Sequence, residues 1–359
     1  MSHDFAIIGA GIVGATIAAE LVPDARVLLL EAEDQPGYHS TGRSAAFWSA
    51  TYGGPGIQPL TSASAEAFAA GGWLQPLGSL HIGRAEDEAA VEAFLAAFAD
   101  TDIPLRRVDP AEHVPGLRSD WVFGVVEPTC AYIDVGGLHG AALAVAKRGG
   151  AELVTRARLE AAERRDGRWS LTTSAGVFEA EVLVNAAGAW ADPIAALAGA
   201  KPLGIQPYRR TIVQLRTEPA SPEGMAHVAD IAGRFYFKPE AGGKLWLSPH
   251  DETPVDPHDT APEELDVAVA IDRFEQVVDW RVAAVERRWA GLRSFAPDRL
   301  PVYGFDPGVP GFFWAAGQGG FGIQTAPAAA KLAAVLLTRR GDVPAGVEAG
   351  RYGPERFLT

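Results

Sequence analysis

The stretch DFAIIGAGIVGATIAAELV, residues 4–22, decides the fold. It opens with an apolar run typical of a buried strand and closes with the periodicity of a helix, and a glycine-rich turn separates the two. Gly9, Gly11 and Gly14 in this turn match the dinucleotide fingerprint. The first glycine permits the tight turn, the second lets the backbone approach a pyrophosphate, and the third lets helix and strand pack closely.

Glu31 strengthens this match, because it ends a second apolar strand 20 residues beyond Gly11. A carboxylate there accepts hydrogen bonds from a ribose diol and argues against the 2′-phosphate of NADP. The diphosphate itself is expected at the positive N-terminus of the helix, beside Ile12 and Val13. A glycine-rich turn in an ordinary α/β domain is the alternative, and the combination of strand, helix and acid weighs against it.

Composition narrows the class of protein. The chain has 359 residues, enough for two domains, and its 48% apolar and 21% charged residues are typical of a globular protein. The net charge of −14 argues against a nucleic-acid partner. The single cysteine, Cys130, excludes an internal disulfide and favours a reducing compartment. With no basic leader segment and no apolar helix of bilayer length, we predict a cytoplasmic protein without a transmembrane segment.

Strand and helix signals divide the chain into two interleaved parts. Apolar strands with adjoining helices occur at the start, in the middle and at the end of the chain, whereas alternating strands between 203 and 290 predict an antiparallel sheet. The predicted fold class is mixed α/β, with a Rossmann-type domain around a parallel sheet and a substrate domain around an antiparallel sheet. The first is expected to comprise residues 1–78, 135–201 and 289–359, and the second residues 79–134 and 202–288.

The segment PGYHSTGRSAAFWSATYG, residues 36–53, follows the second strand where a nicotinamide domain would continue into its next βα unit. With this arrangement the chain resembles the amino-acid-oxidising flavoproteins of the D-amino-acid oxidase and glycine/sarcosine oxidase superfamily. The segments VNAAGAW (184–190), GLRSF (291–295) and AAGQGGFGIQTAP (315–327) fall where that family has corresponding ones. The resemblance is strongest to bacterial D-arginine dehydrogenase-like enzymes, which share the PGYHSTGRSAA and WAGLRSF patterns.

The resemblance implies FAD as the cofactor. It places residues 40–45 around the pyrophosphate, the ribityl chain and the flavin ring, the Arg158 backbone at the adenine, and 319–325 at the pyrimidine edge. The helix from about 326 is expected to aim its N-terminus at the flavin N1–C2=O locus. The expected cofactor contacts are Gly9, Gly11, Ile12, Val13, Gly14, Glu31, Ser40, Thr41, Arg43, Ser44, Ala45, Ala46, Arg158, Ala187, Gly188, Trp190, Gly319, Gly320, Phe321, Gly322, Ile323, Gln324 and Thr325. A surface ion pair is the alternative for Arg43.

We predict that the FAD is not covalently attached. Cys130 lies in an early strand of the substrate domain, away from the flavin-edge segment, and is better interpreted as a small core residue. His39 is the other conceivable tether.

Arg210 and Arg293 match the family's carboxylate-binding positions, and a guanidinium grips a carboxylate through two parallel hydrogen bonds. Strand alternation lets only one of Arg209 and Arg210 face the site. A salt bridge in an acidic protein is the alternative for each arginine. Tyr52 and Tyr236 are candidates to bond the carboxylate or cover the pocket, or else are core aromatics. Gly320 is expected to present its carbonyl to the substrate amine, and Gln324 to close the site.

The chain departs from the arginine enzymes at two positions. Ser79 stands where those enzymes are expected to carry a carboxylate for the substrate guanidinium, and Phe47 stands where they are expected to carry a histidine. A cationic side chain entering an apolar site without a counter-charge is costly. The departures therefore predict a preference for D-amino acids with neutral or hydrophobic side chains.

The resemblance implies oxidation of a D-amino acid by hydride transfer to flavin N5, followed by hydrolysis of the imino acid to a 2-oxo acid and ammonia. The alternatives are a flavin oxidase of N-methyl or other secondary amino acids or of a 2-hydroxy acid, and a flavoprotein redox sensor without catalysis. Oxygen, a quinone or another carrier fits as the electron acceptor. No metal is expected, since the acidic loop 250–259 is better interpreted as solvated than as a cation site.

Overall fold

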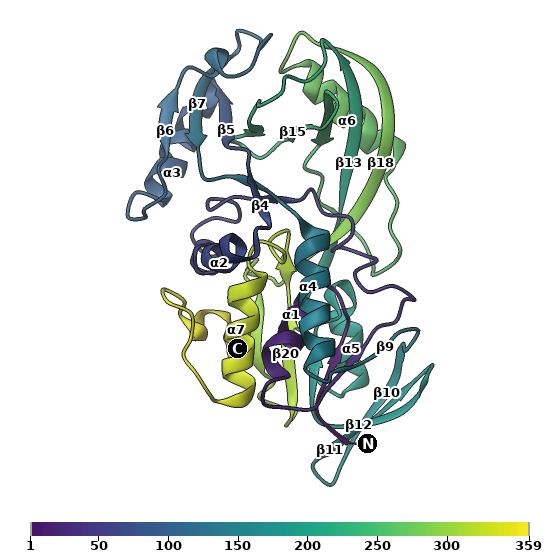
Figure 1. Ribbon diagram of the computed structural model, residues 1–359. Helices are drawn as coiled ribbons and strands as arrows, with labels where there is room; N and C mark the ends of the chain where they lie inside the picture. The colour runs from purple at the N-terminus through teal and green to yellow at the C-terminus, as the bar shows by residue number, and fades with distance from the viewer. Residues whose placement is uncertain (1, 358–359) are drawn as a thin grey trace.

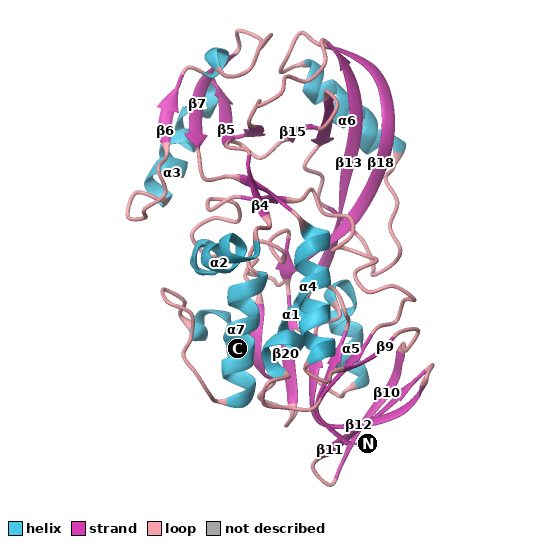
Figure 2. Cartoon of the chain, in the orientation of Figure 1, coloured by secondary structure: helices cyan, strands magenta, loops and turns pink. Residues whose placement is uncertain are grey.

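The computed structural model describes residues 2–357 and builds them around two large sheets and one small one. Figure 1 shows a half that contains the parallel sheet and most of the helices, and a second half that contains the antiparallel sheet. The same division is visible in Figure 2, where long strands dominate one end of the molecule. This architecture confirms the mixed α/β fold predicted from the sequence.

The first sheet has eight strands within residues 2–357. β1 lies at its centre, between β2 and β12, and all three run parallel. β9 extends the sheet beyond β2, and β20 pairs in parallel with the end of β12. The strands are β1 (Ser2–Ile8), β2 (Val27–Leu30), β9 (Glu152–Val154), β10 (Leu159–Arg165), β11 (Arg168–Thr173), β12 (Gly176–Asn185), β19 (Val302–Phe305) and β20 (Phe312–Ala316).

Helices cover both faces of this sheet. Successive side chains of β1 alternate between the two faces, so each face receives apolar residues that a helix can bury. Phe5 and Ile7 pack against α1 (Ile12–Leu21), α4 (Val135–Arg148) and α7 (Ala326–Thr338). Ala6 and Ile8 face the other side, where α5 (Ala191–Leu197) lies. The continuous burial of residues 5–8 in β1 and of all of β2 is therefore the burial expected of a parallel sheet covered on both faces.

Two hairpins extend the parallel sheet with antiparallel strands. Asp166 and Gly167 connect β10 to β11 and both have positive φ values, +50° and +81°. Two successive positive φ values are the signature of a turn that matches the twist of a tight hairpin. The next hairpin places Ser174 and Ala175 between β11 and β12, which begins at Gly176. An Asp-Gly and an Ala-Gly dipeptide thus lie at the two hairpin turns of this sheet.

The second sheet has ten strands within the described chain, in the order β21-β18-β13-β16-β15-β14-β5-β7-β6, with β17 paired to β13. β13 and β18 are its longest strands, and they run antiparallel over most of their length toward the parallel sheet. The strands are β5 (Ser79–Arg84), β6 (Arg106–Val108), β7 (Trp121–Glu127), β13 (Gln206–Glu218), β14 (His227–Asp230), β15 (Tyr236–Glu240), β16 (Lys244–Ser248), β17 (Thr253–Pro254), β18 (Arg281–Phe295) and β21 (Gln318–Gly319).

α6 (Glu264–Glu275) packs on one face of this sheet through Val267, Ala270 and Phe274. A third sheet joins β8 (Ala131–Ile133) to β3 (Phe47–Trp48) and β4 (Leu74–Pro76). The remaining elements are α2 (Gln58–Gly71), α3 (Glu88–Ala97) and five short 3₁₀ helices, Ala85–Asp87, Pro110–Glu112, Gly188–Trp190, Ala349–Tyr352 and Pro354–Phe357.

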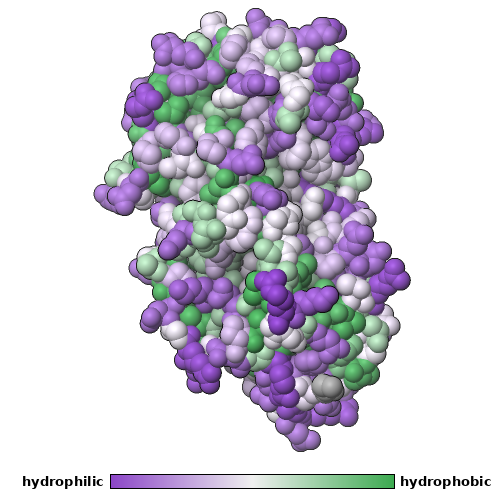
Figure 3. Space-filling model, in the orientation of Figure 1, coloured by the Kyte–Doolittle hydropathy of each residue, from purple (hydrophilic) through white to green (hydrophobic). Residues whose placement is uncertain are grey.

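On the face that Figure 3 shows, polar residues spread over both halves and apolar residues form smaller areas between them. Within residues 2–357, no helix combines the length and the apolar character that a bilayer crossing requires.

Candidate functional site

The turn after β1 needs glycine for steric reasons that the structure makes explicit. Gly9 has φ +100°, and a Cβ added there would lie 2.6 Å from the carbonyl oxygen of Ala186. A Cβ on Gly14 would overlap the carbonyl of Gly9, because α1 crosses the strand so closely. Both glycines therefore hold the backbone in a compact turn at the carboxyl edge of the parallel sheet.

The N-terminus of α1 is arranged to receive an anion. Its first turn has no acidic residue, and the N-cap residue, Gly11, has no side chain that could bond the first amides of the helix. Thr41 approaches from the following loop and accepts a hydrogen bond from the amide of Ile12, with Oγ1 3.0 Å from the nitrogen. Because the amides and the helix dipole at this end are electropositive, a phosphate group fits here.

Glu31 is buried, and two backbone amides orient its carboxylate. Ala10 donates to Oε2 at 2.9 Å, and Glu33 donates to Oε1 at 3.0 Å. Each oxygen keeps a further lone pair, and Glu31 lines the cavity described next. The carboxylate can therefore accept hydrogen bonds from a diol without losing its own support.

A cavity of about 380 Å³ runs from this turn to the ends of β13 and β18. This volume falls within the range of small-molecule and cofactor sites. Most of the residues expected to contact FAD line it: Gly9, Gly11, Ile12, Val13, Glu31, Ser40, Thr41, Arg43, Ser44, Ala45, Arg158, Ala187, Gly188, Trp190, Gly319, Gly320, Gly322 and Ile323. Four of the expected contacts besides Gln324 lie outside the lining: Gly14, Ala46, Phe321 and Thr325.

The segment before α7 contributes to the cavity through its backbone more than through its side chains. A Cβ added at Gly320 would lie 2.7 Å from the Tyr52 hydroxyl and 3.0 Å from Nη1 of Arg293, so a side chain there would displace the ends of these two side chains. Gln324 is turned away from the cavity and buried. Its Nε2 donates to the Tyr52 carbonyl at 3.0 Å and to the Thr61 hydroxyl at 2.9 Å. Gln324 therefore supports the loop of Tyr52, and the expectation that it closes the site is corrected.

Arg43 lines part of the cavity, but its guanidinium is bonded to the loop that contains Asp259 and Thr260. Nη2 donates to Asp259 at 2.5 Å, and Nη1 donates to the Thr260 carbonyl at 3.0 Å. The Tyr38 hydroxyl donates to the same Asp259 carboxylate at 3.0 Å. The arginine thus forms the ion pair that was the alternative interpretation of it, and the pair joins two loops at the rim of the cavity.

Arg210 and Arg293 share one face of the second sheet because of the register between β13 and β18. Arg210 pairs with Gly291, which lies two residues before Arg293. Residues paired across strands, and residues two apart on one strand, point to the same face, so the two arginines are diagonal neighbours. Gly291 has no side chain to separate them, and all three residues line the cavity. Arg209 points to the other face and pairs with Asp266, with Nε 3.1 Å from Oδ2.

The Arg210 guanidinium is bonded through Nε and Nη2, whereas its Nη1 has no acceptor among the described residues. Nε donates to the Asp251 carbonyl at 2.7 Å, and Nη2 donates to Glu252 at 3.0 Å. Among the described residues, none accepts from the buried Nη1. Burial, and then repulsion from Arg293, lower the pKa of Arg210. An anion between the two arginines would satisfy the free donor and offset this repulsion.

Arg293 is held by two phenols. Nη1 donates to the Tyr52 hydroxyl, and Nη2 donates to the Tyr236 hydroxyl at 3.3 Å. Neither tyrosine belongs to the lining of the cavity, and both hydroxyls contact the guanidinium. They therefore help to set the direction in which the arginine points.

An aromatic cluster continues from these tyrosines. The Phe47 ring lies 5.1 Å from Tyr52, 5.7 Å from Tyr236 and 4.5 Å from His227, measured between ring centroids. Ser79 lies beneath this cluster, where a hydrogen bond of 3.0 Å joins its Oγ to Nδ1 of His227. The wall therefore consists of rings and neutral polar groups, and neither Phe47 nor Ser79 lines the cavity itself.

Burial lowers the pKa of His227 well below its usual value of 6.5. Below about pH 6.5 the unfolded chain therefore binds a proton that the folded chain does not, and stability falls by about 1.4 kcal/mol per pH unit until the folded pKa is reached. We expect His227→Asn to lose less thermal stability than the unmodified protein between pH 7 and about pH 5.5. Circular dichroism melts at both pH values measure this, with the exposed His113→Asn as control. An equal drop in melting temperature for both variants would contradict the lowered pKa of His227.

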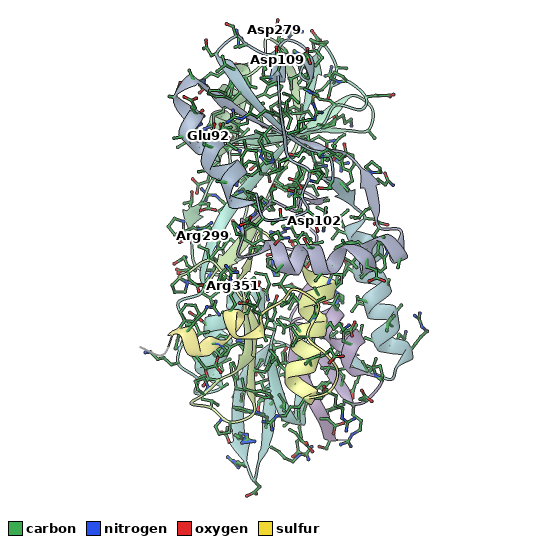
Figure 4. All side chains as sticks on the ribbon, turned by 90° about the vertical axis from the view of Figure 1, so that its left-hand side faces the viewer. Glu92, Asp102, Asp109, Asp279, Arg299 and Arg351 are labelled. Carbon is green, nitrogen blue, oxygen red and sulfur yellow. The ribbon has the colours of Figure 1, made fainter. Side chains whose placement is uncertain are left out.

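Sequence reasoning missed several residues of the site. Asp251 and Glu252 orient Arg210, and Glu252 also accepts from Arg299 at 2.8 Å. Arg299 lies near the middle of the molecule, whereas Asp109 and Asp279 lie at the far end of the second sheet (Figure 4). Ile212 lines the cavity on the same face as Arg210, which strand alternation could have indicated. Asp251 and Glu252 had no such signal, because they lie in the acidic loop that was interpreted as solvated.

Comparison with known proteins gives consistent results. The profile of the FAD dependent oxidoreductases, DAO, matches residues 4–336. The hydrogen cyanide synthase subunit HcnC of Pseudomonas aeruginosa is 29% identical over 239 residues, which make up 66% of this chain and 54% of that protein. The chain thus spans about half the length of the curated relatives it matches.

Solved structures match over nearly the whole chain. L-proline dehydrogenase from P. horikoshii has a TM-score of 0.86 at 23% identity and covers 99% of this chain and 98% of its own. Glycine oxidase from Geobacillus kaustophilus has a TM-score of 0.83 at 24% identity and covers 98% of both chains. At these identities the matches establish the fold.

Proposed function

The chain belongs to the DAO family of FAD dependent oxidoreductases, and from this membership we propose that it oxidises D-amino acids with neutral or hydrophobic side chains. The cofactor is accordingly FAD. When bound, FAD accepts the hydride that leaves the substrate Cα. A proton leaves the substrate nitrogen, and water then replaces the nitrogen of the imino acid to give a 2-oxo acid and ammonia.

The residues around the cavity fit FAD. The glycine turn and the start of α1 fit its pyrophosphate, and Glu31 fits a ribose diol. We propose that residues 1–78, 135–201 and 289–359 form the cofactor domain and residues 79–134 and 202–288 the substrate domain. Attachment is proposed to be non-covalent, because Cys130 is buried away from the cavity and His39 is engaged with Glu33 at 3.0 Å.

One observation supports substrate binding above all others: Arg210, whose buried Nη1 has no acceptor among the described residues, and the neighbouring Arg293 line the same cavity. Two guanidinium groups on one face can grip a carboxylate and turn its Cα toward the cofactor, and such positioning is worth several kcal/mol, on the order of 10³-fold or more in rate. The carbonyl of Gly320 is proposed to accept from the substrate amine. Tyr52 and Tyr236 hold Arg293 in this arrangement.

The wall behind the arginines supports a neutral substrate side chain. Phe47, Ile212 and Tyr236 belong to one apolar cluster. Ser79, which stands where the arginine enzymes are expected to offer a carboxylate, is bonded to His227. The carboxylate next to Ser79, Glu127, already accepts hydrogen bonds from Ser49, Ala50 and Thr51, so a substrate guanidinium placed here would find no free counter-charge, which costs several kcal/mol.

Anaerobic mixing of the purified FAD-loaded protein with a panel of substrates tests this proposal. We expect D-Leu, D-Met and D-Phe to bleach the flavin absorbance faster than D-Arg, D-Lys or the L-enantiomers. Faster bleaching by N-methyl amino acids, L-proline or a 2-hydroxy acid would replace the proposed substrate class. Failure of every compound to bleach the flavin would favour a redox sensor without catalysis.

Asp259 is expected to help retain the cofactor, because it joins the loop of Tyr38 and Arg43 to the opposite domain across the cavity rim. In Asp259→Asn the ion pair is lost, and partly exposed pairs of this kind contribute about 1 kcal/mol, so FAD should dissociate about fivefold faster. The rise of free FAD fluorescence after dilution measures this rate. Asp256→Asn in the same loop serves as control, and equal rates for the two variants would contradict the role of Asp259.

A further inference from the structure

Glu127, the last residue of β7, is a fully buried carboxylate that no part of the proposed reaction uses. Donors from one short loop surround it. The amide of Ala50 donates to Oε1 at 2.7 Å, and the hydroxyls of Ser49 and Thr51 donate to Oε2 at 2.9 and 2.6 Å. Three successive residues of the loop are therefore tied to one anion.

The loop tied to Glu127 leads directly into Tyr52. The amide of Tyr52 donates to the Ser49 carbonyl at 3.3 Å. This hydrogen bond fixes Tyr52 relative to the loop that Glu127 anchors. From the other side, Gln324 Nε2 donates to the Tyr52 carbonyl at 3.0 Å. The Tyr52 hydroxyl then accepts from Nη1 of Arg293. The chain of contacts thus runs from Glu127 through the loop and Tyr52 to the guanidinium.

The charge state of Glu127 suits this anchoring. Burial raises the pKa of Glu127, but the nearby His81 ring and the hydroxyls of Thr51 and Ser49 outweigh burial and hold the pKa below its usual value. Nε2 of His81 lies 3.7 Å from Oε2. Hydrogen bonds to an ionised acceptor are shorter and stronger than those to a neutral one. An anion at this position therefore holds the loop more firmly than an amide would.

We propose that Glu127 is a positioning residue of the carboxylate site, which holds Arg293 in its binding orientation by fixing Tyr52. This inference rests on the proposed binding of a substrate carboxylate by Arg210 and Arg293. Glu127 touches neither the cavity nor the reacting atoms, so its effect should appear in ligand affinity and KM. Because Arg293 also directs the substrate Cα at the cofactor, kcat/KM should fall at least as far as the ligand Kd rises.

Titration of the FAD-loaded protein with benzoate, followed by the change in flavin absorbance, measures carboxylate affinity without turnover. We expect Glu127→Gln to raise the benzoate Kd about tenfold, the size of a typical coupling between residues in contact. We expect the same substitution to add less than about twofold when Tyr52 is already Phe, since the path to Arg293 is then broken. The KM of the preferred amino acid should rise in parallel with the benzoate Kd.

Two further variants make the test specific. Asp306→Asn is a matched control, because Asp306 also accepts from three donors, the amides of Gly308 and Val309 and the indole of Trp314, at the opposite end of the parallel sheet. It should leave the benzoate Kd unchanged. Thr51→Val removes a donor while it leaves Glu127 in place, and it is used if Glu127→Gln loses its fold or its FAD. It should raise the Kd in the same direction and with the same dependence on Tyr52.

Two results would overturn the inference. One is an unchanged benzoate Kd in both Glu127→Gln and Thr51→Val. The other is an equal increase in the presence and absence of the Tyr52 hydroxyl. If the unmodified protein binds benzoate but oxidises no amino acid, the proposed reaction fails while the positioning role of Glu127 stands. If the unmodified protein binds no benzoate, both fail.

Discussion

Replacing Arg293 with Lys should lower kcat/KM for the preferred amino acid by about 10³-fold, because lysine keeps the charge but loses the planar fork that binds a carboxylate bidentately. Arg293 sits in the cavity, and the guanidinium nitrogens Nη1 and Nη2 donate to Tyr52 and Tyr236. A lysine ammonium cannot keep both phenols and the substrate in place. The substrate Cα would then no longer be directed at the cofactor.

The matched control is Arg209→Lys. Arg209 is the neighbour of Arg210 on β13, but it faces α6 and pairs with Asp266. Its substitution should change kcat/KM by less than about threefold, as expected for an ion pair outside the site. Both variants should keep their FAD, because neither substitution touches the glycine turn. Comparable activity in Arg293→Lys and the unmodified protein would remove Arg293 from the proposed substrate site.

Gly9→Ala is expected to leave the protein with less than about a tenth of its normal FAD, since the glycine turn must remain in a left-handed conformation. The backbone at Gly9 has φ +100°, and the added Cβ would lie 2.6 Å from the carbonyl of Ala186. Relief of that overlap moves the turn away from the sheet edge and displaces the start of α1. FAD released into the supernatant by acid precipitation measures the content, and its release also tests the non-covalent attachment.

Gly346→Ala separates local strain from loss of the cofactor site. Gly346 also has a positive φ, +75°, but an added Cβ would meet no heavy atom within 4 Å among the described residues. This variant should lose about 1 kcal/mol of stability and keep its FAD. Circular dichroism of Gly9→Ala shows whether the chain is folded. A folded Gly9→Ala protein with normal FAD content would contradict the assignment of the turn to the pyrophosphate.

The sequence determined by itself the elements whose signals are local. The glycine turn, the strand before it and the helix after it occupy seventeen consecutive positions from Phe5 to Leu21, and the structure contains all three. The Asp-Gly hairpin at 166–167 and the alternation of Arg209 and Arg210 are local in the same sense. Propensity, turn chemistry and periodicity act over a few residues, so they can be evaluated without knowledge of the fold.

Only the tertiary structure decided which partners these residues find. Arg43 reaches Asp259 across 216 positions, and Gln324 reaches Tyr52 across 272. Glu127 accepts hydrogen bonds from a loop that lies 76 to 78 positions earlier in the chain. A charge can be buried only where the packing of distant elements brings hydrogen-bond donors to it. No local sequence pattern specifies which donors these are. The supports of the site therefore became visible only when β7, β13 and β18 were assembled.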